Sequence, residues 1–168
     1  ADKELSDEDL IADEDVVITI SSRGYIKRQP LVTYRRQARG GKGIIGARTV
    51  EEDAVGHLLV ANTHDWALFF TDRGRVFSSK VHEIPDASRQ AKGMPIINLE
   101  GVQVESGERV LATITLRDFE PGHNLVMATV KGIVKKTPIE KFERVRSTGI
   151  RAITVADDDK LAWVATSS

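Results

Sequence analysis

Short apolar runs separated by polar turn residues cover most of the chain beyond residue 15. The runs are five to eight residues long and rich in β-branched and aromatic side chains. They are residues 16–20, 57–61, 66–70, 109–116, 124–130, 151–156 and 161–165. This pattern is typical of β-strands, and no long stretch has the 3.6-residue periodicity of a helix. The sequence therefore predicts an all-β fold.

Three of these runs open copies of one longer pattern. In each copy the apolar run leads into a turn made of a basic residue and Gly, and a basic segment ending in a second Gly follows. The paired glycines are Gly24 and Gly43, Gly74 and Gly93, and Gly132 and Gly149. Because hairpin turns need a positive φ, which Gly adopts at little cost, we expect a hairpin at the first glycine of each pair. Repetition about every fifty residues predicts a propeller or another array of one unit.

The repeats set the expected domain organisation. Residues 1–14 are expected to form an acidic linker, and residues 15–168 a partial array of blades. We expect the blades at about residues 15–56, 57–108 and 109–156, with the start of a fourth at 157–168. The final residues LAWVATSS resemble HLLVANTH, which opens the second copy. The chain is therefore expected to be a fragment of a longer array.

Length and composition limit the class of protein. With 168 residues and 40% apolar composition, the chain can form one ordinary domain with a core. The absence of cysteine excludes disulfides and thiolate metal sites, and no apolar run is long enough to span a bilayer. The acidic N-terminus lacks the order of a secretory signal, which favours a bacterial cytoplasmic protein.

Charge is strongly segregated along the chain, although the net charge is only −1. Residues 1–15 contain eight acidic residues and one lysine, whereas residues 16–50 contain eight Lys or Arg and no acid. A basic segment of this kind predicts a polyanionic partner.

The heptad QARGGKG at residues 37–43 is the sharpest local motif. Its three glycines would let the backbone approach a partner while Arg39 and Lys42 project toward phosphates. A flexible turn that is merely basic is the alternative for the heptad alone. Arg35 and Arg36 lie just upstream and extend the basic run, which favours phosphate binding.

Three stretches carry a family resemblance, DVVITISSRGYIKRQPLVTYRRQARGGKG, THDWALFFTDRGRVF and EIPDASRQAKGMPIINL. Together they closely resemble the C-terminal domain of the A subunit of bacterial DNA gyrase, and the resemblance covers nearly the whole chain. The heptad is similar to the box motif of that family, Gln-basic-Arg-Gly-Gly-basic-Gly. Ala38 stands where the family commonly has a basic residue, and Arg36 would partly supply that contact.

The resemblance implies a six-bladed β-pinwheel, a propeller-like disc of antiparallel four-stranded blades, of which this chain would hold about three. It implies a non-catalytic module that bends duplex DNA around a basic rim and directs ATP-dependent negative supercoiling. The whole enzyme would combine two A and two B subunits, use ATP and Mg²⁺, and lie in the cytoplasm with the nucleoid. No cofactor and no membrane contact are expected for this chain. The related topoisomerase IV subunit has a degenerate version without an intact box, so the box favours gyrase.

Basic residues at matching positions of successive repeats extend the predicted DNA-binding surface. Stacked blades would align them into one curved track that binds by shape and charge, with strong salt dependence. The residues predicted to bind DNA are Arg23, Lys27, Arg28, Arg35, Arg36, Gln37, Arg39, Gly40, Gly41, Lys42, Gly43, Arg73, Arg75, Lys80, Arg89, Lys92, Lys131, Lys135, Lys136 and Arg146.

Other motifs have simpler explanations. Residues 41–46 satisfy G-x-G-x-x-G, yet no βαβ pattern surrounds them, and Gly43 occupies the position where a Walker A loop needs Ser or Thr. The four histidines lack metal-ligand spacing, and no nucleophile motif exists, so neither catalytic residues nor a metal site are expected. Aromatic residues in strands are expected to pack in the core rather than stack on bases. They are Trp66, Phe69, Phe70, Phe77 and Trp163.

Two other functions stay open from the residues alone. One is a protein-interaction propeller whose acidic segments dock a partner, and the other is a hydrolase on a propeller scaffold, for which the sequence has no nucleophile and base. Salt dependence separates DNA wrapping from protein interaction, because contacts with many phosphates make affinity fall steeply with the logarithm of salt concentration.

Replacing Arg39 and Lys42 together with alanine is expected to weaken DNA binding, because both charges are predicted to project from a glycine-rich loop. In the intact enzyme the double variant is expected to lose most negative supercoiling while keeping ATP-dependent relaxation or decatenation. Topoisomer gels measure these activities. Unchanged supercoiling would contradict the role of the box.

Overall fold

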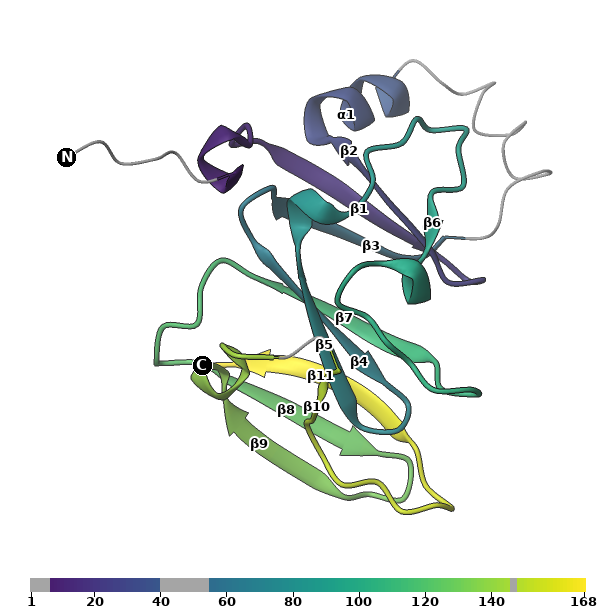
Figure 1. Cartoon of the computed structure of the whole chain (residues 1–168), viewed down its shortest axis with the longest axis vertical. Helices are drawn as coiled ribbons and strands as arrows, with labels where there is room; N and C mark the ends of the chain where they lie inside the picture. The colour runs from purple at the N-terminus through teal and green to yellow at the C-terminus, as the bar shows by residue number, and fades with distance from the viewer. Residues whose placement is uncertain (1–6, 40–54, 146–147) are drawn as a thin grey trace. The chain divides into compact units, whose positions relative to one another are not determined.

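The computed structural model describes residues 7–39, 55–145 and 148–168, and these are mostly β-strands and turns (Figure 1). The strands are β1 (Asp15–Ser21), β2 (Tyr25–Pro30), β3 (Val55–Asn62), β4 (Trp66–Thr71), β5 (Arg75–Lys80), β6 (Met94–Pro95), β7 (Val110–Leu116), β8 (Asn124–Thr129), β9 (Val134–Pro138), β10 (Ile150–Arg151) and β11 (Leu161–Ser167). The helical segments are α1 (Leu31–Arg39) and the short 3-10 helices η1 (Asp7–Leu10), η2 (Val81–Glu83), η3 (Ile96–Asn98) and η4 (Ile139–Phe142). None of these described helices is long and apolar enough to cross a membrane.

The described strands form three antiparallel sheets. Sheet A has the order β3-β1-β2-β6, sheet B the order β10-β5-β4-β7, and sheet C the order β11-β8-β9. Their pairings are antiparallel throughout. The predicted all-β array of antiparallel sheets is confirmed, and two of the sheets have the four strands expected of a blade.

Sheets A and B each take strands from two successive repeats. In sheet A the central β1-β2 hairpin belongs to the first repeat, whereas β3 and β6 come from the start and the end of the second. Sheet B combines the β4-β5 hairpin of the second repeat with β7 and β10 of the third. The expected intervals 15–56, 57–108 and 109–156 therefore mark repeats of the sequence, and neither sheet consists of one interval alone.

The chain divides into two compact units. Unit 1 comprises Ala1–Asp65 and Lys80–Ile96, and unit 2 comprises Trp66–Ser79 and Ile97–Ser168. Unit 1 contains sheet A and α1, and unit 2 contains sheets B and C. The division follows the strand exchange, because the second repeat places its hairpin in unit 2 and returns its later segment to unit 1.

The three central hairpins have the same turn. Its glycine has a positive φ in each copy, +85° at Gly24, +80° at Gly74 and +95° at Gly132. The glycine amide donates to the carbonyl three residues earlier at 3.0 Å, and the hydroxyl of that earlier residue accepts from the amide four residues further on. The hydroxyl residues are Ser21, Thr71 and Thr129. The predicted hairpins are confirmed, and glycine suits them because L-residues rarely adopt this backbone region.

A helical segment begins seven residues after each turn glycine, as α1, η2 or η4. The sequence predicted no helix and a loop at residues 37–39, and α1 corrects both predictions. Pro30, the last residue of β2, directly precedes α1 and has no amide proton to donate to a neighbouring strand. One face of α1 is half-buried, at Leu31, Tyr34 and Gln37, and the other is exposed, at Val32, Arg35 and Arg36. At nine residues the helix is too short for this period to stand out in the sequence.

Sheets B and C share one apolar core inside unit 2. Its members are at most 3% exposed and include Leu68, Phe70, Val76, Leu125, Met127, Ile153 and Leu161. Phe69 and Phe77 are also fully buried, as expected for aromatic residues in strands. Trp66 is half-buried, and its ring centroid lies 5.7 Å from that of Phe119.

Two predictions about apolar positions in unit 2 are wrong. Residues 151–156 do not form a strand beyond β10, because the amides of Ala152 and Ile153 both donate to the Gly74 carbonyl and turn the chain. Ala152 and Ile153 are apolar because both side chains are buried in the core of unit 2. Trp163 is 48% exposed, since a β-bulge between Leu161 and Trp163 shifts the register of the edge strand β11.

The glycine at the end of each basic segment permits a close approach between repeats. Gly93 has a φ of +87°, and a Cβ atom there would lie 2.2 Å from the Ile26 carbonyl oxygen on β2. Gly149, the equivalent in the third repeat, has a φ of +76° and would bring a Cβ atom within 2.8 Å of the Phe77 ring on β5. The regular spacing of these glycines therefore reflects docking of one repeat on the hairpin of the previous one. Gly43 lies outside the described residues.

Gly93→Ala is expected to destabilise the protein more than Gly24→Ala. Both substitutions place alanine at a positive φ, which costs about 1–2 kcal/mol. Only Gly93→Ala adds a clash, because nothing lies within 4 Å of a Cβ atom built at Gly24. We expect the total loss at Gly93 to exceed about 2 kcal/mol in urea denaturation. Equal losses in the two variants would contradict the close approach of Gly93 to β2.

Candidate nucleic-acid interface

Lys27 on β2 does not extend freely toward a ligand. Its Nζ donates to three backbone carbonyls of the later segment of unit 1, at Ser88 (3.1 Å), Arg89 (2.7 Å) and Ala91 (2.8 Å). An ammonium group has three protons, and all three find acceptors in this loop. Lys27 therefore fixes the conformation of the basic segment of the second repeat.

Arg28, the next residue on β2, holds the same segment. Its Nε donates to the Ile84 carbonyl at 2.7 Å, and its Nη2 donates to the His82 carbonyl at 3.3 Å. The backbone amide of Arg28 also donates to the Pro85 carbonyl at 3.0 Å. Lys80 acts similarly, since its Nζ donates to the His64 carbonyl at 3.1 Å. These cations bind backbone of their own unit.

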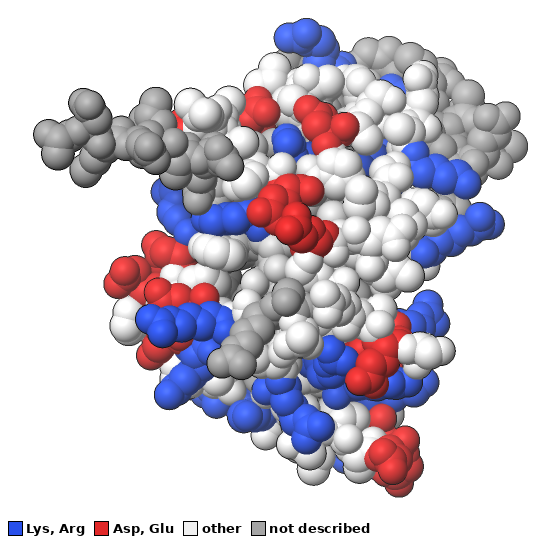
Figure 2. All heavy atoms as spheres, viewed as in Figure 1, with Lys and Arg blue, Asp and Glu red and all other residues white. Residues whose placement is uncertain are grey.

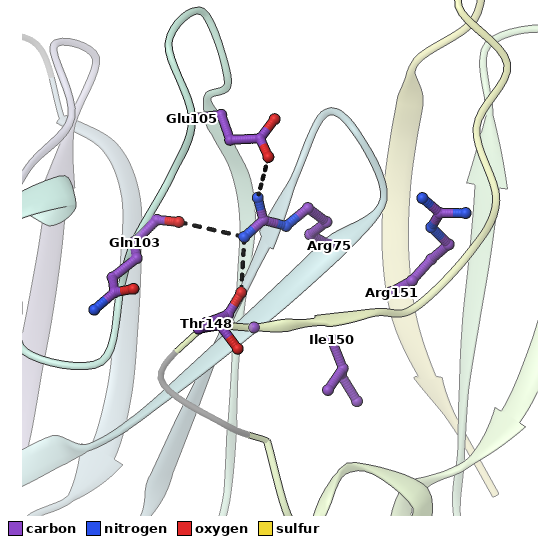
Figure 3. Close-up of a pocket in the computed structure, with 7 residues that line it drawn as sticks. Arg75, Gln103, Glu105, Thr148, Ile150 and Arg151 are labelled. Carbon is purple, nitrogen blue, oxygen red and sulfur yellow. Dashed lines mark hydrogen bonds and ion pairs between the residues drawn. The ribbon is translucent and has the colours of Figure 1, made fainter.

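Arg75 has an equivalent role in unit 2 (Figure 3). Its Nη2 donates to the carbonyls of Thr148 (2.8 Å) and Gln103 (3.3 Å), and its Nη1 donates to the Glu108 carboxylate at 3.2 Å. Its guanidinium carbon lies 4.9 Å from the centroid of the Phe77 ring. Arg75, Gln103 and Thr148 line part of a cavity of about 480 Å³. The hydrogen bonds of Arg75 tie β5 to the connection between repeats and to the start of β10.

The cations at two hairpin turns are paired with acids. Arg73 Nη1 lies 3.0 Å from the Glu105 carboxylate, and its Nη2 donates to the Ser106 carbonyl at 2.9 Å. Lys131, at the equivalent position of the third repeat, forms an ion pair with Asp158. Glu105 belongs to residues 100–108, which connect the second repeat to the third, and Asp158 belongs to residues 157–159, which follow the third; both connections are rich in acids.

Two further acids of these connections are buried, a feature that the sequence analysis missed. Glu108 is 5% exposed and accepts from the Thr71 hydroxyl at 2.6 Å and from the Glu105 amide at 2.9 Å. Asp159 is 9% exposed and accepts from the amides of Lys131 (3.0 Å) and Lys160 (2.8 Å). Each acid thus caps a hairpin turn. The signal in the sequence is their position, two residues before the next strand, and Asp53 stands at the same distance before β3.

The hydrogen bonds at Asp159 change its acidity. Burial alone would raise the pKa of Asp159, but hydrogen bonds from the Thr129 hydroxyl and from the amides of Lys131 and Lys160 lower it below the ordinary value. The nearby Lys131 ammonium lowers the pKa further. These bonds favour the ionised carboxylate because they donate to it. The folded protein therefore holds this group as an anion at neutral pH.

The remaining predicted cations lie mainly on the segments that follow the hairpins. Among the described residues, none of these side chains has an acidic ion-pair partner. They are Arg35 and Arg36 on α1, Arg89 and Lys92 before β6, and Lys135 and Lys136 on β9. All except the half-buried Arg89 are exposed. Lys92 Nζ lies 5.9 Å from the centroid of the Tyr25 ring.

The other residues that the sequence predicted to bind DNA lie at the first turn, on α1 or outside the described residues. Arg23 is exposed at the first hairpin turn, and Gln37 is half-buried on α1. Arg39 ends α1. Gly40, Gly41, Lys42, Gly43 and Arg146 lie outside the described residues. Figure 2 shows acidic and basic side chains interspersed on the face in view, so the basic surface is not continuous there.

The described residues contain no group of three His, Cys, Asp or Glu side chains that could hold a metal ion. His64 instead takes part in local structure, with Nε2 3.1 Å from the Ile11 carbonyl oxygen. The arrangement presents exposed cations on a scaffold of β-strands.

Repeated antiparallel sheets with exchanged strands define a propeller-like domain. The model of the family "DNA gyrase C-terminal domain, beta-propeller" matches residues 15–62, 65–113 and 123–168. The chain belongs to this family.

Curated relatives agree with this assignment. The A subunit of DNA gyrase from Salmonella typhimurium is 51% identical over 94% of this chain, and that from Mycolicibacterium smegmatis is 48% identical over 96%. The A subunit of DNA gyrase from Staphylococcus aureus is 44% identical over 99% of the chain. The chain spans only 18% to 19% of the length of these relatives.

Solved structures have the same fold. The C-terminal domain of DNA topoisomerase IV matches with a TM-score of 0.74 and 29% identity, covering 93% of this chain and 46% of that one. A DNA gyrase A C-terminal domain matches with a TM-score of 0.64 and 21% identity, covering 92% of this chain and 48% of that one. The second likeness shows the fold alone.

Lowering the pH is expected to destabilise the protein through Asp159. The folded-state pKa is lowered, so the stabilisation is complete above the unfolded-state pKa of about 3.9 and is lost as pH falls through the folded-state value. Asp159→Asn is expected to reduce the free energy of unfolding at pH 7 and to flatten its dependence between about pH 5 and pH 2.

Urea denaturation at a series of pH values measures both effects. Asp157→Asn is the matched control, because the neighbouring Asp157 is exposed and its substitution removes the same charge. An identical pH profile for Asp159→Asn and Asp157→Asn would contradict the role of Asp159 as a turn cap.

Proposed function

We propose that this chain is a non-catalytic module that binds and wraps duplex DNA within a DNA gyrase of the type IIA topoisomerase class. The observation that carries the proposal is the set of exposed cations without acidic partners, among the described residues, on the segments after the hairpins. They recur in all three repeats, as Arg35 and Arg36, Lys92, and Lys135 and Lys136. Membership of the gyrase C-terminal domain family supports the same function.

The chemistry of these side chains suits phosphate rather than bases. Lys and Arg side chains neutralise phosphates and release counterions, which gives affinity without reading sequence. A bent path would add a dependence on DNA deformability. The buried aromatic residues Phe69, Phe70 and Phe77 offer no stacking surface to unpaired bases.

The proposal extends to the protein of which the chain would be a part. In that protein the module would direct ATP-dependent negative supercoiling, working with the rest of the A subunit and with the B subunit in an A2B2 complex. ATP and Mg²⁺ would be used by other domains, and the enzyme would act in the cytoplasm at the nucleoid. The cations after the hairpins would guide DNA, and catalysis would take place elsewhere.

The proposal separates the predicted basic residues into two groups. Arg35 and Arg36 would contact phosphates, whereas Lys27 and Arg28 would hold the loop from His82 to Ala91 in place. Lys27 and Arg28 would influence the affinity for DNA only through the conformation of this loop. Substitutions therefore have different consequences for stability and for binding.

Replacing Arg35 and Arg36 together with alanine is expected to lower DNA affinity and to reduce the salt slope, d log K/d log [salt], by up to about 1.8 in magnitude. Stability should change by less than about 0.5 kcal/mol, because both side chains are exposed and have no partner among the described residues. Fluorescence anisotropy with a labelled duplex at several salt concentrations measures the slope, and urea denaturation measures the stability.

Lys27→Met is the contrasting variant. It keeps much of the aliphatic side chain but removes three hydrogen bonds, so we expect it to cost about 1–3 kcal/mol of stability. The salt slope of DNA binding should then stay near that of the parent. If the affinity of the parent chain for duplex DNA did not depend on salt concentration, the proposed function would be overturned and the protein-interaction alternative would be favoured.

A further inference from the structure

The exposed cations of unit 2 lie in two different electrostatic environments. Those after the hairpins, such as Lys135 and Lys136, have no acidic partner among the described residues. Those at the hairpin turns, Arg73 and Lys131, are each paired with an acid from the following connection. The sequence treated both groups as one DNA-binding track. The structure separates them.

The two turns lie at the same end of unit 2. The connection between β10 and β11 contacts both of them, because the Leu161 amide donates to the Asp72 carbonyl and Asp159 accepts from the Lys131 amide. Figure 1 shows the β4-β5 turn and the β8-β9 turn on one side of this unit. We call this end, with its turns and acidic connections, the turn end.

Carboxylates at least balance the cations at the turn end. Around the second hairpin, three acids, Asp72, Glu105 and Glu108, match three cations, Arg73, Arg75 and Arg109. Glu105 lies 3.0 Å from Arg73 and 3.5 Å from Arg75. Around the third, the acids Asp157, Asp158 and Asp159 face two ammonium groups, those of Lys131 and Lys160. A phosphate backbone approaching here would meet neutralised cations and additional negative charge.

Stability does not account for these pairs. The side chains of Arg73, Glu105, Lys131 and Asp158 are 46%, 66%, 55% and 71% exposed, respectively. Exposed ion pairs contribute only about 0–1 kcal/mol each. The same arrangement nevertheless occurs in two successive repeats, and its strongest physical effect is on the local electrostatic potential.

We propose that Glu105 and Asp158 form an acidic margin at the turn end that excludes the DNA backbone and confines it to the cations after the hairpins. The inference rests on the proposed function and deepens it, because it assigns a steering role to acids rather than bases. It also removes Arg73 and Lys131 from the set of phosphate contacts. The margin sets the path of the duplex by repulsion, which is how binding surfaces discriminate between alternative poses.

The test is DNA binding by the full chain carrying Glu105→Gln and Asp158→Asn together. These substitutions keep side-chain size and free both cations, so a labelled linear duplex is expected to bind about two- to fivefold more tightly. The salt slope should steepen by up to about 1.8, because two more phosphates would be neutralised. Adding Arg73→Ala and Lys131→Ala to this variant should restore the parent's affinity and slope.

The matched control carries Asp118→Asn and Glu120→Gln, which change the charge by the same amount. Both residues are exposed in the β7-β8 connection, at the opposite end of β8 from its turn. The inference requires a larger effect at the turn end than in this control. Equal effects would show that only net charge matters, and no effect at the turn end would also overturn the inference.

The outcomes separate this inference from the proposed function. If the parent binds duplex DNA with a steep salt dependence and the turn-end variant behaves like the parent, the acidic margin is wrong and the proposed function stands. If the parent does not bind duplex DNA at any salt concentration, both are wrong. Unchanged thermal melting of each variant confirms that folding is not the cause of a difference.

Discussion

Strand exchange between successive repeats is the constraint on which the rest of the structure depends. A hairpin alone leaves backbone donors and acceptors unpaired along both edges. Sheets A and B meet this need with the first strand and the last short strand of the next repeat. The short strand β6 can dock only because Gly93 has no side chain to strike the Ile26 carbonyl. Each repeat therefore encodes its own hairpin and a segment that completes another.

This constraint explains why so many basic residues are not available for a ligand. Lys27 and Arg28 donate to carbonyls of the segment that has been brought from the next repeat, and Arg75 does so in unit 2. Carbonyls of irregular backbone have no partner from a sheet ladder and need other donors where they are shielded from water, and a long cation can reach several of them at once. The cations that remain exposed, such as Arg35 and Lys136, lie outside these contacts. Basic residues in this fold therefore serve assembly, and in the proposed function a separate set of them serves binding.

The acidic residues, like the basic ones, divide into a group with a structural role and an exposed group. Glu108 and Asp159 are buried because the hydroxyls and amides of the hairpin turns need acceptors, and a carboxylate accepts several hydrogen bonds at once. Glu105 and Asp158 are exposed beside the turn cations and act on the surrounding potential. Neighbouring acids of one connection thus have distinct roles, one in folding and one at the surface.

The sequence by itself determined the β class, the three repeats and the hairpins, because alternating burial and the positive φ of Gly74 are local requirements written into short stretches. It could not determine which repeat completes which sheet, because that pairing joins segments that are far apart in the chain. The sequence located the basic residues but could not tell that Lys27 is hydrogen-bonded within the protein whereas Arg35 is exposed. The difference lies in backbone carbonyls that the next repeat supplies to Lys27. The sequence also missed α1 and the exposure of Trp163, which follow from packing and from a bulge. Local conformation is thus readable from the residues, whereas the partners of each charge are decided only when distant segments meet.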